Sequence, residues 1–236
     1  MRTSPAADGG PADGNTAARA WMRQRRAERR RMLQRQIWSR GVRDRRVLAA
    51  MARVPREFFI APALAAQAYD DVPLPTTHGQ TISQPYMVAL MTAEARLTRR
   101  SQVLEIGTGT GYHAAVLASL AHAVFSVERV PEMVKEAADR LASLGLSNVT
   151  CLVGDGAWGH APAAPYHAIV VAAAVPAPPP RLLNQLDLWG RLVIPVGDRS
   201  LQELMVYQRT PTGFEARSSG TCRFVPLVSP AAFGDG

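Results

Sequence analysis

Short apolar runs and segments with helical spacing of apolar residues alternate along the chain from residue 85 onward. The runs predict strands at 102–106, 123–128, 149–153, 168–173 and 191–196, and the helical spacing predicts a helix starting at Pro85 and helices at 112–120, 131–144 and 179–187. Such alternation favours an α/β fold, a doubly wound, mostly parallel sheet with helices on both faces. Two further runs, 201–209 and 214–225, flank the turn Pro211-Thr212-Gly213 and predict an antiparallel edge.

The N-terminal part has a different pattern. Residues 1–15 are small and polar, a composition typical of disorder, and residues 16–38 are rich in arginine with helical spacing. Asp44 is expected to cap a helix that Pro55 stops, and residues 60–84 to form a long loop. We therefore expect a disordered, basic extension over residues 1–30 and a single domain over 31–236. Within that domain, 31–84 would supply N-terminal helices and a substrate loop, and 85–228 the cofactor-binding core.

Charge and composition narrow the class. The formal net charge of +8 belongs to residues 1–60, which hold fifteen arginines against five acids. The sequence contains no run of eighteen apolar residues and no apolar signal segment, and its two cysteines lack metal-ligand spacing. We expect a cytoplasmic, monomeric protein with free thiols and no bound metal.

The most specific stretch is the turn after the strand at 102–106. Glu105 precedes glycines at 107, 109 and 111, so the backbone can approach a ligand closely at the carboxyl end of the strand. A dinucleotide-binding fingerprint would need glycine at 112, where Tyr112 stands, and Glu105 would face an anionic pyrophosphate. The turn thus disfavours a nucleotide-dependent oxidoreductase and suits a cationic ligand without phosphates.

Three acids fall at successive strand ends. Glu105 ends the first strand, Glu128 ends the second, and Asp155 follows the third within Gly154-Asp155-Gly156. Each one alone could be a helix or turn cap. Together with the glycine turn they could receive ribose hydroxyls and lie beside a flat base. This constellation resembles the class I S-adenosylmethionine-dependent methyltransferases, so the expected cofactor is S-adenosyl-L-methionine.

A second group of motifs makes the resemblance more specific. Ser83 alone reads as a cap of the helix at Pro85. However, the block from Gln80 to Tyr86, the glycine turn, and three later segments occur in one order, and together they look like the protein-L-isoaspartate (D-aspartate) O-methyltransferase family. The later segments are 153–156, 190–197 and 223–227. The resemblance covers roughly residues 33–228, and its family-specific parts are the Thr81-Ile82-Ser83 block and the Val225-Pro226-Leu227 tail.

The resemblance implies a role for each matching residue. Ser83 would touch the substrate carboxylate as the catalytic residue, while Thr81, Ile82 and Val225 would hold an isoaspartyl peptide. Cofactor contacts are implied for Glu105, Gly107, Thr108, Gly109, Gly111, Glu128, Asp155 and Gly156. The reaction implied is methylation of the free carboxylate of L-isoaspartyl residues in damaged proteins, which begins repair through a succinimide. A carboxylate is ionised at neutral pH, so no general base is required.

One residue departs from the family pattern. His167 stands where the family usually has an aspartate, at the amino end of the predicted strand 168–173. Because this end lies away from the expected ligand side, we expect an effect on stability rather than on activity.

Three alternatives remain open from the sequence, one of them a family member that binds the cofactor but has lost turnover. A related carboxylate methyltransferase could act on a biosynthetic peptide. The arginine-rich N-terminus could instead bind nucleic acid, although such a run is more often a solvated helix face.

Overall fold

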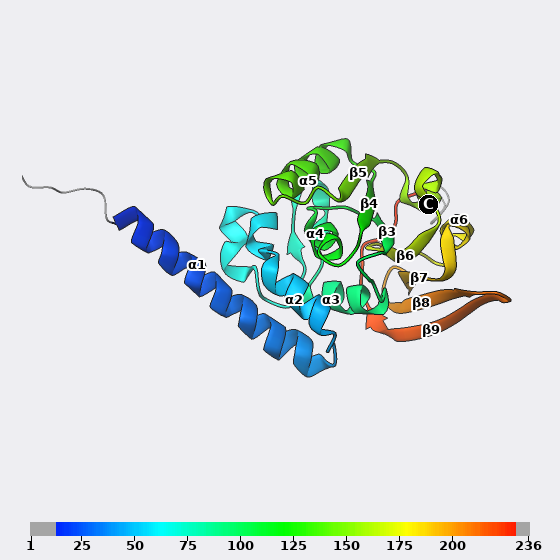
Figure 1. The fold of residues 1–236 in the computed structure, drawn as a ribbon, viewed down its shortest axis with the longest axis horizontal. Coiled ribbons are helices and arrows are strands. Elements are labelled where there is room, and N and C mark those ends of the chain that lie inside the picture. The colour runs from blue at the N-terminus through cyan, green and yellow to red at the C-terminus, as the bar shows by residue number, and fades with distance from the viewer. Residues whose placement is uncertain (1–12, 230–236) are drawn as a thin grey trace, which may run out of the picture.

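The computed structural model describes residues 13–229 (Figure 1). Its core is a seven-stranded sheet in the order β5-β4-β3-β6-β7-β8-β9. The strands are β3 (Gln102–Ile106), β4 (Ala123–Glu128), β5 (Val149–Val153), β6 (Tyr166–Val171), β7 (Leu186–Gly197), β8 (Gln202–Thr210) and β9 (Gly213–Cys222). Strands β3 to β7 run parallel, and β8 and β9 form an antiparallel edge. The predicted α/β class with a mostly parallel sheet is therefore confirmed.

Helices cover both faces of this sheet. They are α1 (Asp13–Met32), α2 (Arg45–Arg53), α3 (Pro85–Glu94), α4 (Tyr112–Ala118), α5 (Pro131–Ser143) and α6 (Pro180–Asn184). On one face, Val103 and Val170 pack with residues of α3 and α4, and on the other Leu104 and Ile169 pack with Leu182 of α6. Burial on both faces explains why the central strands are continuous apolar runs.

The strand order reverses between β3 and β6. From β3 the chain continues outward through β4 to β5, and then returns to place β6 on the other side of β3. The carboxyl ends of β3, β4 and β6 consequently meet at one edge, which is where open parallel sheets bind ligands.

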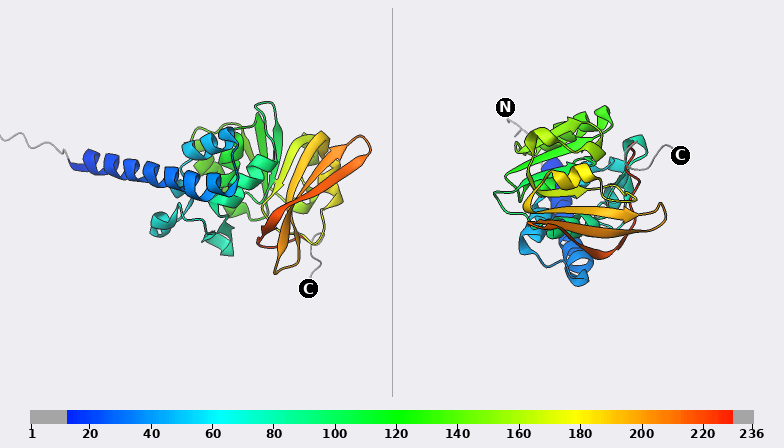
Figure 2. Two further views of the ribbon diagram at one scale, coloured as in Figure 1. Left: turned by 90° about the horizontal axis from the view of Figure 1, so that it is seen from below. Right: turned by 90° about the vertical axis from the view of Figure 1, so that its right-hand side faces the viewer.

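The N-terminal helix packs on the body through its C-terminal half. Figures 1 and 2 show α1 projecting from the end of the molecule opposite the β8–β9 hairpin. Arg25 and Arg29 of α1 are buried, and a π-helical turn (Leu33–Ile37) continues the chain toward α2. The domain boundary that we expected at residue 30 falls inside this helix, and residues 1–12 of the expected extension lie outside the described residues.

Several predicted boundaries differ from the structure for local reasons. Strand β7 begins at Leu186 rather than at 191, because Leu186 pairs with Tyr166 across a register shift in β6. This shortens the predicted helix 179–187 to the five residues of α6. The predicted loop 60–84 contains a small antiparallel sheet of β1 (Leu74–Pro75) and β2 (Thr81–Ile82).

Two expectations about single residues can be followed directly. The carboxylate of Asp44 caps α2 by accepting a hydrogen bond from the Arg46 amide at 2.8 Å, as predicted. His167 is exposed at the start of β6, and its Nδ1 accepts a hydrogen bond from the Gln102 amide at 3.1 Å. This contact with the neighbouring strand lies at the amino end of the sheet and agrees with a structural role for His167.

Candidate active site

A cleft that is open to solvent lies at the carboxyl edge of the sheet. Its inner wall comes from the ends of β3 and β4 and from Ala172 and Ala173 after β6. Its outer wall comes from two segments distant in sequence, 80–83 and 225–228. The second segment is held there by pairing with Ala174, whose amide donates to the Val225 carbonyl at 2.8 Å. This pairing ends β9 at Cys222, before the predicted limit of 225.

The glycine turn forms part of the inner wall of the cleft. Gly107, Gly109 and Gly111 have φ values of 91°, 53° and 89°, conformations that strongly favour glycine. Gly107, Thr108 and Gly109 line the cleft. Gly111 is not among the lining residues and instead faces α5, where a Cβ on it would lie 3.3 Å from Cβ of Ala137. Its glycine identity therefore serves the packing of the turn against α5.

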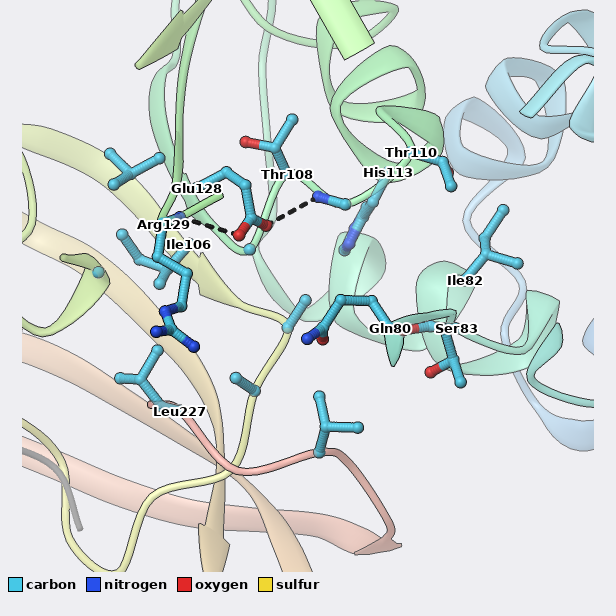
Figure 3. A pocket seen from close by; sticks show the side chains of 18 of the residues that line it. Gln80, Ile82, Ser83, Ile106, Thr108, Thr110, His113, Glu128, Arg129 and Leu227 are labelled. Atoms are coloured by element: carbon cyan, nitrogen blue, oxygen red, sulfur yellow. Dashed lines mark hydrogen bonds between the residues drawn. The ribbon is translucent and has the colours of Figure 1, made fainter. Parts of the chain in front are cut away.

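Glu128 is fixed at the end of β4 by backbone donors. Its Oε2 accepts a hydrogen bond from the Gly109 amide at 3.2 Å, and its Oε1 accepts from the Arg129 amide at 2.8 Å (Figure 3). The carboxylate is thus preorganised beside the glycine turn and still lines the cleft.

Asp155 and Gly156 have separate positions. The Asp155 carboxylate accepts hydrogen bonds from the Ala157 amide at 2.9 Å and from the Ser229 hydroxyl at 2.7 Å, and it is not among the residues that line the cleft. Gly156 does line it. A Cβ at Gly156 would lie 2.2 Å from Cγ2 of Ile106, so a larger residue would push into the inner wall.

Glu105 lies behind the glycine turn and is fully buried. The Ser126 hydroxyl donates to its Oε2, and burial, with a smaller effect of the Glu128 charge, raises the pKa of Glu105 to about 8. Glu105 is not among the lining residues. The structure brings nine of the twelve predicted site residues to the cleft wall, namely Thr81, Ile82, Ser83, Gly107, Thr108, Gly109, Glu128, Gly156 and Val225.

Ser83 lies on the outer wall between β2 and α3. The cap position of α3 is Gln84, and no side chain makes a cap hydrogen bond there. Ser83 is therefore not the helix cap that its position suggested. Figure 3 shows Ser83 and Ile82 on the side of the cleft opposite Glu128, and the Gln80 side chain lies between that side and Glu128. Within the described residues the Ser83 hydroxyl makes no hydrogen bond, which leaves it available to a ligand.

Sequence reasoning gave no role to several cleft residues, among them Gln80, His113 and Arg129. His113 read only as the residue that opens the helix after the glycine turn. In the structure it is nearly buried in the cleft wall, and burial lowers its pKa to about 4. The helical spacing of apolar residues could have shown which side of α4 carries His113. The sequence alone could not have shown how close His113 lies to Glu105.

Comparisons with known proteins agree with this fold. A solved protein-L-isoaspartate O-methyltransferase structure matches with a TM-score of 0.76 and 27% identity, over 86% of this chain and 67% of the other. A structure from Plasmodium falciparum, described as a candidate protein-L-isoaspartate O-methyltransferase in complex with S-adenosyl-L-homocysteine, matches with a TM-score of 0.73. That match, at 24% identity, covers 86% of this chain and 98% of the other and supports the fold alone.

The sheet order and the cleft at its switch point define a Rossmann-like methyltransferase of class I. The family model for protein-L-isoaspartate(D-aspartate) O-methyltransferase matches residues 27–232. The chain belongs to this family. Curated relatives include protein-L-isoaspartate O-methyltransferase 1 of Syntrophobacter fumaroxidans, 50% identical over 85% of this chain and 94% of the relative. The protein-L-isoaspartate O-methyltransferase of Geobacter metallireducens is also 50% identical, over 87% of this chain and 96% of the relative.

Proposed function

We propose that this chain transfers a methyl group from S-adenosyl-L-methionine to the free carboxylate of L-isoaspartyl residues in damaged proteins. The observation that carries this proposal is the pairing of two walls in one cleft. A glycine turn with the fixed Glu128 carboxylate forms one wall, and Ser83, with an unpaired hydroxyl, forms the other. Family membership supports the same activity, and repair through a succinimide would follow the methylation.

The inner wall fits a nucleoside cofactor that carries positive charge. Gly156 lets the backbone at the cleft wall pack directly against Ile106, where a Cβ would lie 2.2 Å from Cγ2 of that residue. Glu128 presents acceptor oxygens to hydroxyl groups, and the buried Glu105 carboxyl places a second acid behind the turn. When bound, S-adenosyl-L-methionine supplies a methyl group made electrophilic by its sulfonium. We assign its binding to Glu105, Gly107, Thr108, Gly109, Gly111, Glu128, Asp155 and Gly156, with Gly111 and Asp155 acting through the shape of the turns.

The outer wall fits a carboxylate acceptor. The Ser83 hydroxyl can donate one hydrogen bond to an anionic oxygen and so orient it, and Thr81, Ile82 and Val225 would flank the peptide. Because the acceptor is ionised at neutral pH, the cleft needs no proton acceptor for it. The residues of the cleft would therefore act mainly by positioning, which can contribute on the order of 7–11 kcal/mol.

Methyl transfer to a synthetic peptide tests this function. The protein is incubated with labelled S-adenosyl-L-methionine and either an isoaspartyl peptide or its aspartyl isomer. We expect base-labile label on the isoaspartyl peptide only. Equal labelling of both isomers, or none of either, would contradict the proposal.

We also propose that the protein acts as a monomer in the cytoplasm, without metal or nucleic acid. Both cysteines are free thiols, which fits a reducing compartment. Within residues 13–229 no helix has the length and apolar character to cross a bilayer, and no three His, Cys, Asp or Glu side chains are grouped to hold a metal ion. Sedimentation of the purified protein would test the monomer.

A further inference from the structure

The buried Glu105 carboxyl has one oxygen that lacks a partner. Its Oε2 accepts a hydrogen bond from Ser126, whose hydroxyl also lies 2.6 Å from the Thr108 hydroxyl. Its Oε1 is buried and has no hydrogen-bond partner. Leaving an acceptor of this kind unpaired inside a protein is unfavourable, and more so when it is charged. A proton or a nearby cation would therefore stabilise the carboxyl group at this oxygen.

The protonation of His113 can be worked out from its other neighbour. The Thr92 hydroxyl donates its only hydrogen to the Val88 carbonyl, at 2.7 Å. Nε2 of His113 lies 3.0 Å from the same hydroxyl oxygen, which can then only accept. Nε2 must carry the hydrogen, so in the neutral ring Nδ1 is a bare acceptor. Burial, which lowers the pKa of His113 to about 4, keeps the ring neutral near pH 7.

Two acceptors consequently face each other behind the cleft. Nδ1 of His113 lies 4.0 Å from Oε1 of Glu105, too far for a hydrogen bond and without a donor between them. The other ionisable groups that act on Glu105 are Glu128, at the end of β4, and Cys151 on β5, and neither supplies positive charge. A proton on Glu105 removes the charge from this unpaired carboxylate, and a positive charge brought by a ligand would compensate it.

We propose that Glu105 carries one proton in the empty cleft and releases it when the cofactor cation binds. The O–H bond of Glu105 breaks, the proton passes to solvent, and the carboxylate behind the glycine turn then attracts the positive charge in the cleft. His113 is a positioning residue, since its bare Nδ1 gives Oε1 no donor and so leaves the proton on Glu105 until binding. This inference rests on the proposed function, because it takes S-adenosyl-L-methionine as the ligand. The direction of the Glu105 pKa, raised to about 8, agrees with it.

Calorimetric titration measures the released proton. S-adenosyl-L-methionine is titrated into the full chain at pH 7, without peptide, in two buffers of different ionisation enthalpy. We expect the binding heats to differ by an amount that corresponds to nearly one proton released per molecule bound. Affinity for S-adenosyl-L-methionine should also rise about tenfold from pH 6 to pH 7 and level off above pH 8. Below the pKa of Glu105 binding must remove one proton, so each unit of lower pH weakens it about tenfold.

Two histidine variants separate the pair from a general effect. In His113→Gln the bare Nδ1 is replaced by a side chain with amide hydrogens, which favour the ionised form of Glu105 before binding, so proton release should fall while binding persists. His122→Gln, which changes an exposed histidine between α4 and β4, should release as much as the native chain. A ¹⁵N spectrum of the empty protein should show Nδ1 of His113 without a hydrogen, and this signal should be lost in His113→Gln.

The outcomes distinguish this inference from the function on which it rests. Binding with the same heat in both buffers would overturn the proton release alone. Full proton release in His113→Gln, or a hydrogen on Nδ1, would overturn the role of His113. A complete lack of binding would contradict the proposed function and this inference together.

Discussion

At the residue scale, the Ser83 hydroxyl is the group that the proposed chemistry uses most directly. It lines the cleft opposite Glu128 and has no hydrogen-bond partner among the described residues. A hydrogen bond to a charged group contributes about 1.5–3 kcal/mol. We expect Ser83→Ala to lower kcat for an isoaspartyl peptide by roughly 10- to 150-fold and to leave cofactor affinity unchanged, since Ser83 lies on the acceptor wall.

Steady-state kinetics together with a cofactor titration would measure both effects. Ser143→Ala, an exposed serine at the end of α5, is the matched control and should keep native rates. Native turnover in Ser83→Ala would show that another group orients the carboxylate.

Gly156 offers a second test, of the inner wall. In Gly156→Ala the new Cβ would meet Cγ2 of Ile106 at 2.2 Å, so one of them must move. Overpacking of this kind costs typically 1–3 kcal/mol, and we expect both lower stability and weaker binding of S-adenosylhomocysteine. Because Ile106→Ala removes the atom in conflict, the double variant should be less destabilised than the sum of the two single changes. Simple additivity in urea unfolding would contradict this packing.

The types of residue at the site could be predicted from the sequence, but how deeply each side chain is buried could not. The glycine spacing and the acids at the strand ends are visible because each lies next to a recognisable strand. The same acids differ in surroundings, since Glu128 lines the cleft, Asp155 accepts from Ala157 and Ser229, and Glu105 is buried. Burial depends on which helix covers each strand end, and a single sequence does not contain that information.

At the element scale, the buried Arg29 anchors α1 to the rest of the fold. Arg29 donates to the Tyr69 hydroxyl and the Ala52 carbonyl, each at 2.8 Å, and pairs with Glu57 at 3.2 Å. Tyr69 in turn donates to Glu57. These contacts join α1 to α2 and to the segment after it.

Removing the arginine should therefore loosen the N-terminal part of the fold. Breaking a buried ion pair on one side costs about 3–5 kcal/mol, because Glu57 stays buried without its partner. We expect Arg29→Met to lose stability of this order in urea unfolding. The exposed neighbour Arg30→Met should stay within about 0.5 kcal/mol of the native chain. Equal effects of the two changes would mean that α1 is not held by Arg29.

The contacts of Arg29 also explain why the sequence did not predict that the end of α1 packs on the domain. An arginine-rich helix with few apolar residues resembles a solvated extension, because the partners of Arg29 lie 23 to 40 residues away. Strands β3, β4 and β5 have the bounds predicted for them because each is a short apolar run bounded by turn residues, whereas α4 ends two residues before the predicted limit of 120. The start of β7 was missed because it depends on pairing with β6.

For the whole molecule, the Glu105 pKa predicts how stability varies with pH. A carboxyl with a folded pKa of about 8 is protonated in the folded state and ionised in the unfolded state above about pH 4.5. Its contribution is therefore fully present below that pH and is lost as the pH rises to about 8. The lowered pKa of His113 acts in the opposite sense between about 4 and 6.5, and its contribution is constant above that range.

Between pH 6.5 and 8 the Glu105 effect is thus the one of the two that changes. We expect the free energy of unfolding of the ligand-free protein to fall with pH by about 1.4 kcal/mol per unit over most of this window. In Glu105→Gln that part of the slope should disappear. Parallel urea titrations of the two proteins give the difference, and identical slopes would contradict the raised pKa.

The order of the sheet lies beyond what hydrophobic periodicity can give. Periodicity places strands along the chain but does not say that β6 lies beside β3, which creates the switch point and the cleft. The sequence predicted a doubly wound, mostly parallel sheet, and the order of its strands comes from the structure.

The central claim is that one cleft holds the cofactor on its glycine wall and an isoaspartyl carboxylate at Ser83. A crystal structure of this protein with S-adenosylhomocysteine and an isoaspartyl peptide tests it most directly. We expect the isoaspartyl carboxylate within hydrogen-bond distance of Ser83 Oγ, with the cofactor sulfur on the opposite side of that carboxylate. A peptide bound outside this cleft, or a cofactor that fills the space beside Ser83, would contradict the account.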